Sequence, residues 1–141
     1  MTISIDTNVI AALWKDDHSM NAVVVEMLGG LIAHEKLVVS GPVYAELMAG
    51  PLRDEASLDL FFKDTGIDVD WEMDEEIWRE AGRVYRAHVQ RRQASRGGDA
   101  RRILADFLIG AHAAVAGYRL LTRDAARYRS HFPGLPLISP Q

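Results

Sequence analysis

The stretch from residue 103 to 117, ILADFLIGAHAAVAG, constrains the fold more than any other part of the chain. Its apolar and small residues recur at helical spacing, which is typical of a helix buried inside a domain. On such a helix Asp106 shares a face that would pack closely against a sheet, made of Ile103, Phe107, Gly110, Ala113, Ala114 and Gly117. A buried carboxylate without a partner costs several kcal/mol or becomes protonated. The sequence must therefore supply a partner for Asp106.

Composition narrows the class of protein. A chain of 141 residues that is 48% hydrophobic predicts one domain over residues 1–141. No apolar run approaches the roughly 18 residues of a membrane span, and the N-terminal residues do not resemble a signal peptide, so we expect a cytoplasmic protein without membrane association. Cysteine is absent and no two histidines are four residues apart, which disfavours thiolate and histidine zinc sites. Any metal is expected on oxygen ligands.

The charges are distributed unevenly along the chain. Residues 1–78 carry four Lys or Arg against sixteen Asp or Glu, a balance of −12, whereas residues 79–129 carry twelve Arg against four acids, a balance of +8. One interpretation is that these are solvated helix faces that attract each other. The other is that the arginines form a surface for phosphates, while the acidic half supplies a metal site. Composition leaves both open.

Strand and helix patterns alternate along the chain. Strands are predicted at residues 2–6, 37–40, 67–71, 119–122 and 135–138, and the third and fifth are expected to be edge strands. Helices are predicted at residues 8–14, 19–35, 41–48, 56–64, 75–93, 103–117 and 124–132. The core face of the helix at residues 75–93 is predicted to consist of Ile77, Trp78, Ala81, Val84, Tyr85 and Val89. The alternation indicates an α/β domain with a parallel sheet covered on both faces.

Four acids follow or lie near the predicted carboxyl ends of strands: Asp6, Glu46, Asp106 and Asp124. Ligands in such folds bind at that edge of the sheet, so the four side chains can converge there. Carboxylates that share a pocket repel one another unless they are protonated or neutralised by a cation. Mg²⁺ or Mn²⁺ fits this donor set and leaves positions for a phosphate and a water. Hydrogen bonds could come from Thr7, Asn8, Ser40 and Thr122.

Each acid also has a structural interpretation. Asp6 and Asp124 can be helix N-caps, and Glu46 can be a solvated helix residue. Asp106 can pair with Arg101 or Arg102 one turn before it. His112 is interpreted as a helix histidine whose ring nitrogens are either hydrogen-bonded within the protein or exposed to solvent.

Four segments, taken in order, resemble a known family. ISIDTNVI contains Asp6 and Asn8, PVYAEL contains Glu46, ADFLIGAHA contains Asp106, and LLTRDAARYRSHFPGL contains Thr122 and Asp124. Together they resemble the PIN-domain ribonucleases, specifically the VapC-type toxins of type II toxin–antitoxin systems. The resemblance implies a three-layer α/β/α fold around a mostly parallel sheet of four or five strands. It also implies metal-dependent endoribonuclease activity, a homodimer, and a cognate antitoxin encoded by a neighbouring gene.

The expected site follows from the acids and this resemblance. Asp6, Asp106 and Asp124 are expected to hold the metal, with Glu46 acting directly or through water, and phosphodiester hydrolysis would proceed by in-line attack of water. Backbone phosphate contacts to RNA are hypothesised for Arg86, Arg91, Arg92 and Arg96. Two alternatives remain open. One is a phosphatase or phosphotransferase that uses Asp6 as a nucleophile, and the other is a non-catalytic RNA- or protein-binding module whose acids bind metal only structurally.

Overall fold

The computed structural model describes residues 1–15, 18–50, 54–96 and 103–140. The strands are β1 (Thr2–Ile5), β2 (Lys36–Ser40), β3 (Asp68–Asp70), β4 (Arg119–Leu121) and β5 (Leu137–Ile138). The helices are α1 (Thr7–Leu13), α2 (His18–Ile32), α3 (Gly41–Met48), α4 (Glu55–Thr65), α5 (Glu75–Ala94), α6 (Leu104–Ala116) and α7 (Ala125–His131). The element order agrees with the sequence-based prediction.

The five strands form one parallel sheet in the order β3-β2-β1-β4-β5. Ile3 on β1 pairs with Leu37 on β2 and with Arg119 on β4, so β1 is the central strand. The chain builds the sheet in one direction from β1 to β3 and then continues on the other side of β1. The predicted α/β class and the two predicted edge strands, β3 and β5, are confirmed.

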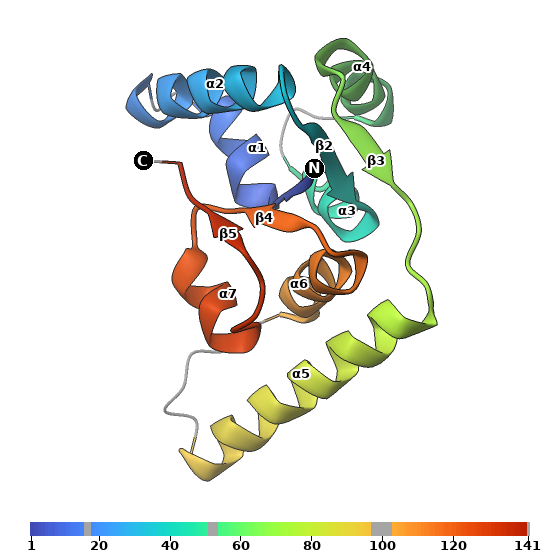
Figure 1. Ribbon diagram of the computed structural model, residues 1–141, viewed down its shortest axis with the longest axis vertical. Helices are drawn as coiled ribbons and strands as arrows, with labels where there is room; N and C mark the ends of the chain where they lie inside the picture. The colour runs from blue at the N-terminus through green and yellow to red at the C-terminus, as the bar shows by residue number, and fades with distance from the viewer. Residues whose placement is uncertain (16–17, 51–53, 97–102, 141) are drawn as a thin grey trace.

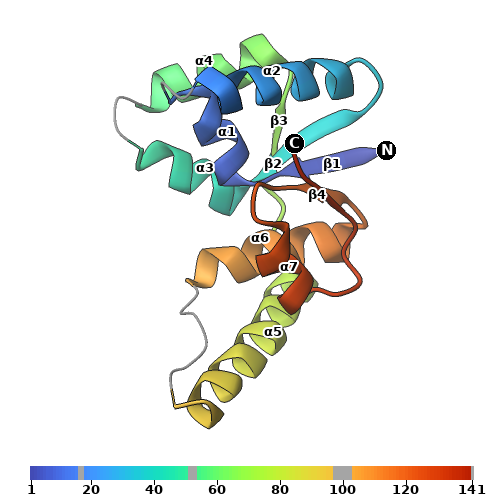
Figure 2. The ribbon, with the colours of Figure 1, turned by 90° about the vertical axis from the view of Figure 1, so that its left-hand side faces the viewer.

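Helices cover both faces of the sheet (Figures 1 and 2). The helices α1, α2 and α4 lie on one side, α6 and α7 lie on the other, and α5 packs along the outer side of α6. The helix α3 contacts α1, α4 and α6. Within the described ranges, none of the helices is both long enough and apolar enough to cross a membrane.

The segment that sets the fold is confirmed as a buried helix. Every residue of α6 from Asp106 to Ala113 is buried, and Gly117 ends the helix with a φ of 76°, a conformation that glycine adopts at little cost. The predicted packing stripe is confirmed only in part, because Phe107, Gly110 and Ala113 are buried whereas Ile103, Ala114 and Gly117 are exposed. Gly110 faces the ring of Phe132, from the segment after α7, where an added Cβ would lie 2.6 Å from Cδ2.

The core face of α5 is narrower than predicted. Ile77 and Ala81 are buried, but Trp78 is 52% exposed and Tyr85 is 36% exposed. His88, which the prediction left out, is buried instead. The reason is that α5 packs mainly along α6, with a smaller contact to His131 on α7, rather than into a broad core, so only a narrow line of its residues is covered.

His112 is fully buried in α6 and joins that helix to the edge strand β3. Its Nε2 lies 2.9 Å from Oδ2 of Asp70, a geometry in which the imidazole N–H donates to the carboxylate. This pair satisfies Nε2, whereas the buried Nδ1 has no hydrogen-bond partner among the described residues, so the interpretation of His112 as a satisfied helix histidine holds for only one of its two ring nitrogens.

Candidate active site

Asp6 lies at the end of β1, where the strand order reverses between β1 and β4. Its backbone N–H donates to the Leu121 carbonyl at 2.9 Å, and its side chain is almost completely buried. Oδ1 accepts from the Thr7 N–H at 2.8 Å, and Oδ2 accepts from the Thr122 hydroxyl at 2.8 Å. Burial raises the pKa of the Asp6 carboxyl above its usual value, while these hydrogen bonds oppose the rise. Asp6 is therefore a firmly held and poorly hydrated acid.

The hydroxyl of Thr122 connects three predicted polar residues, Asp6, Asn8 and Asp124. This fully buried group donates to Asp6 and accepts from the Asp124 N–H at 3.0 Å. The amide of Asn8 contributes twice, because its Nδ2 donates to the same hydroxyl at 3.4 Å and its Oδ1 accepts from the Arg123 N–H at 3.0 Å. These bonds cross-link the turn after β1 to the turn after β4.

Glu46 reaches the same region from α3. This helix starts directly after β2 with Pro42 in its first turn, a position that suits proline. The Oε1 atom of Glu46 accepts from the Thr7 hydroxyl at 2.6 Å, and the Thr7 N–H is bonded to Asp6. Thr7 therefore links the two acids through one residue.

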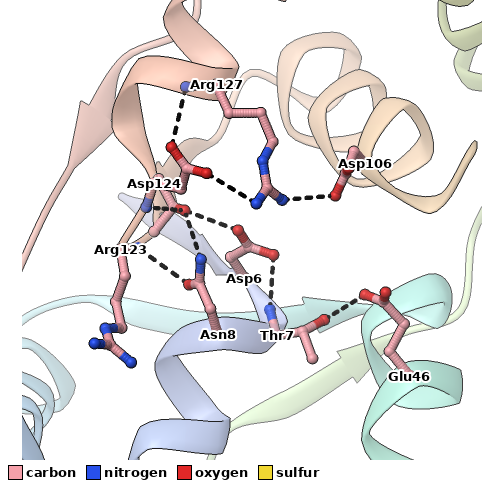
Figure 3. Close-up of polar contacts among 9 residues, drawn as sticks. Asp6, Thr7, Asn8, Glu46, Asp106, Arg123, Asp124 and Arg127 are labelled. Atoms are coloured by element: carbon pink, nitrogen blue, oxygen red, sulfur yellow. Dashed lines mark hydrogen bonds and ion pairs between the residues drawn. The ribbon is translucent and has the colours of Figure 1, made fainter. Parts of the chain in front are cut away.

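Asp106 and Asp124 are joined by Arg127, a residue absent from the predicted site (Figure 3). Its Nη1 lies 2.8 Å from Oδ1 of Asp106, and its Nη2 lies 2.8 Å from Oδ2 of Asp124. Burial disfavours the charged guanidinium, but the two carboxylates outweigh this effect and raise the pKa of Arg127. The alternative partners of Asp106, Arg101 and Arg102, lie outside the described residues. Arg127 could have been found from its spacing, because it stands three residues after Asp124 at the start of a predicted helix.

These side chains surround a cavity of about 440 Å³. It is lined by Asp6, Thr7, Asn8, Ala11, Lys15, Glu46, Ile103, Asp106 and Arg127. Three of the four predicted acids thus line one cavity, and Asp124 is connected to it through Arg127. Among the described residues, no three acidic or histidine side chains are already close enough together to hold a metal ion.

Tyr128 is a second residue that the sequence did not reveal. It follows Arg127 on α7, is buried, and its pKa is raised by burial and by the charges of Asp6 and Asp106. The phenol is therefore held in its neutral, protonated form beside the acids. A tyrosine in a short helix gives no sequence signal that separates such a position from ordinary core packing.

The comparison that decides the family is with the sequence model of the PIN domain, which matches residues 3–130. The chain belongs to the PIN domain family. No curated protein matches the sequence.

Solved structures resemble this PIN domain over nearly its whole length. A chain of VapBC2 from Rickettsia felis, bound to a DNA fragment from its promoter, has a TM-score of 0.75 at 19% identity and 100% coverage of both chains. A chain of VapBC-1 from nontypeable Haemophilus influenzae has a TM-score of 0.71 at 21% identity, covering 99% of this chain and 98% of that one. DNA-bound VapBC from Salmonella typhimurium gives 0.69 at 19% identity, with 100% and 99% coverage. The predicted three-layer PIN-like fold is confirmed.

The four arginines hypothesised to contact RNA do not line the acid cavity of this PIN domain, as far as the described residues define it. They lie on and after α5, where Arg86 and Arg96 are exposed and Nη2 of Arg91 lies 3.2 Å from Nδ1 of His131 on α7. Arg92 and Arg96 line a separate cavity with Val89 and Gln93. Among the described residues, the positive groups that line the acid cavity are instead Lys15 and Arg127.

The donor chemistry of the acid cavity fits a hard divalent cation. Its polar lining consists largely of carboxylate, amide and hydroxyl oxygens, the ligand class that Mg²⁺ and Mn²⁺ bind. Asp6 is buried with a raised pKa, so a nearby cation would favour its ionised form. Asp106 and Asp124 already bind a positive group, the Arg127 guanidinium.

Proposed function

We propose that this PIN domain is a divalent-metal-dependent endoribonuclease that acts in the cytoplasm as the toxin of a type II toxin–antitoxin pair. The observation that supports this most strongly is the shared cavity lined by Asp6, Glu46 and Asp106, with Asp124 attached through Arg127. VapBC complexes are among the solved structures that share its fold. By analogy with them we propose a cognate antitoxin from a neighbouring gene and a homodimer.

In this proposal Asp6, Asp106 and Asp124 hold Mg²⁺ or Mn²⁺, and Glu46 contributes directly or through water. When bound, the cation supplies Lewis acidity that activates water and stabilises charge on the phosphate. Thr122 and Thr7 keep the Asp6 carboxylate in one orientation through their hydrogen bonds. Lys15 at the rim carries a positive charge suited to RNA phosphates.

The alternative that uses Asp6 as a phosphate-accepting nucleophile is disfavoured by the geometry. Both oxygens of Asp6 accept hydrogen bonds, and the residue is 3% exposed. An attacking carboxylate needs an open approach to phosphorus, which this burial restricts. Detection of a phosphorylated Asp6 by mass spectrometry would favour that alternative over hydrolysis.

The test is to express the chain alone and together with its upstream neighbour gene, and then to map cleaved RNAs with and without Mg²⁺. We expect growth arrest and metal-dependent cuts from the chain alone, and protection by the neighbour. Asp6→Asn and Asp106→Asn should each lower the cleavage rate by at least about 100-fold, because each removes a charged oxygen ligand.

Asp64→Asn is the matched control, since Asp64 is an exposed acid on α4 and should leave cleavage unchanged. RNA binding without cleavage by the wild-type protein would instead indicate the non-catalytic binding module. Wild-type toxicity that persists in Asp6→Asn and Asp106→Asn would also count against the nuclease.

A further inference from the structure

The position of Arg127 is determined by the two acids on either side of it (Figure 3). Asp124 caps the helix that carries Arg127, accepting from its backbone N–H at 3.3 Å, and also binds its guanidinium at 2.8 Å. Asp106 reaches the other guanidinium nitrogen from α6, also at 2.8 Å. The side chain is 24% exposed, so this contact is more than an ion pair on the open surface.

The guanidinium lies between two of the acids that the proposed function assigns to the metal. A divalent cation held by the oxygens of Asp106 and Asp124 would meet a second positive charge at hydrogen-bond distance from both carboxylates. Two cations at that separation repel each other, more strongly in a partly buried site than in water. The guanidinium also forms an ion pair with one oxygen of each acid, and these oxygens are potential metal ligands.

We propose that Arg127 is a displaceable counter-cation of the acid cavity. Its guanidinium neutralises Asp106 and Asp124 in the metal-free protein and must leave both carboxylates when a divalent cation binds. This inference rests on the proposed metal-dependent function. Arg127 therefore competes with the metal for Asp106 and Asp124, and it weakens metal binding while stabilising the metal-free fold.

The first test measures the affinity of the full chain for Mn²⁺ alone by titration calorimetry, without RNA. We expect Arg127→Gln to bind Mn²⁺ at least about tenfold more tightly than the wild type, a typical size for coupling between two ligands. Arg129→Gln is the matched control, because Arg129 is an exposed arginine two residues along the same helix. Its Mn²⁺ affinity should stay within about twofold of the wild-type value.

Thermal unfolding supplies a second readout. Without metal, Arg127→Gln should melt at a lower temperature than the wild type, because two carboxylates lose their partner. With saturating Mn²⁺ its melting temperature should rise by more than that of the wild type, since tighter binding stabilises more. A purely structural role for Arg127 predicts a lower melting temperature with no larger rise on adding Mn²⁺, and that result would overturn the proposal.

Arg127→Lys covers the case in which the glutamine variant does not fold. A single ammonium cannot bridge both carboxylates as a guanidinium does, so Mn²⁺ affinity should lie between those of the wild type and Arg127→Gln. An affinity equal to or weaker than the wild-type value in both variants would overturn the proposal. If the wild type cuts RNA with metal but neither variant binds Mn²⁺ more tightly, the inference about Arg127 fails and the proposed function stands. If the wild type neither binds Mn²⁺ nor cuts RNA, the proposed function fails as well.

Discussion

At the scale of single residues, the structural and functional interpretations of the acids are compatible. Asp6 and Asp124 both cap helices, since Asp6 accepts from the Thr7 N–H and Asp124 from the Arg127 N–H. The cap fixes each carboxylate at the carboxyl end of its strand, and that edge is where the cavity lies. The same hydrogen bond therefore caps the helix and orients the carboxylate in the site.

The pKa values of two capping aspartates, Asp6 and Asp54, are shifted in opposite directions. Burial raises the pKa of Asp6, whereas hydrogen bonds from Ser57 lower the pKa of the exposed Asp54. In metal-free protein, a carboxyl NMR titration should therefore place Asp6 above 3.8 and Asp54 below 3.8. Ionised Asp6 disfavours the folded state, so its contribution to stability is present below its ordinary pKa and lost as pH rises through the raised value.

The contribution of Asp54 to stability has the opposite pH dependence. Its contribution is present above the ordinary pKa and is lost as pH falls through the lowered one. Ser57→Ala removes the hydroxyl donor and should move the Asp54 titration upward without moving that of Asp6. Identical titration midpoints for the two aspartates would contradict this account of their surroundings.

At the scale of elements, α6 holds Asp106 through contacts on several sides. Its buried run packs next to the sheet, α5 covers its outer side, and Phe132 fills the space over Gly110. The glycine is required by this close approach of an aromatic ring rather than by its backbone conformation. Because Phe132 directly follows α7, this contact also packs the end of α7 against α6, the helix that carries Asp106.

Gly110→Ala should destabilise the protein. The added methyl would lie 2.6 Å from Cδ2 of Phe132, so the buried ring must move, and overpacking of this kind costs about 1–3 kcal/mol. The free energy of unfolding from urea titration measures the loss. Gly82→Ala on α5 is the control, because nothing lies within 4 Å of the added methyl there, and it should be neutral or stabilising. Equal stability of Gly110→Ala and the wild type would contradict the packing described.

At the scale of the whole molecule, the acidic first half and the basic second half of the sequence form only partly separate regions in the structure. The acidic cavity is built from both halves of the chain, because Asp6 and Glu46 meet Asp106 there. The arginines of α5 and of the residues after it differ in their partners rather than in their exposure, since Arg79 and Arg83 are also exposed. Arg79 and Arg83 pair with glutamates in the first half of α5. Arg86 and Arg91 lie further along the helix and Arg96 lies just after it, all three exposed.

Charge reversal of Arg86, Arg91, Arg92 and Arg96 together should weaken RNA binding and flatten its salt dependence. Each lost phosphate contact should reduce the slope of log affinity against log salt by about 0.7 for single-stranded RNA. Fluorescence anisotropy with a labelled oligoribonucleotide measures both quantities. Reversal of Arg79 and Arg83 on the same helix is the control, and it should have the smaller effect. RNA affinity that is unchanged by the fourfold reversal would remove α5 from the RNA-binding surface.

The sequence alone determined the order of the elements, the parallel sheet and the four acids. These features depend on local signals: the apolar periods of strands and helices, the capping residues Asp6 and Asp124, and the glycine that ends α6. Because parallel strands direct their carboxyl ends to one edge, the convergence of the acids followed from element order alone.

Only the tertiary structure decided which group meets Asp106. Its charge pairs with Arg127, and that contact depends on how α6 and α7 pack together, with Phe132 against Gly110 and Phe107 against His131, rather than on any local pattern. The exposure of Trp78 and the burial of His88 likewise depend on how much of α5 its neighbour covers. Local sequence specifies where a side chain is attached, but its partners depend on packing between elements distant in the chain.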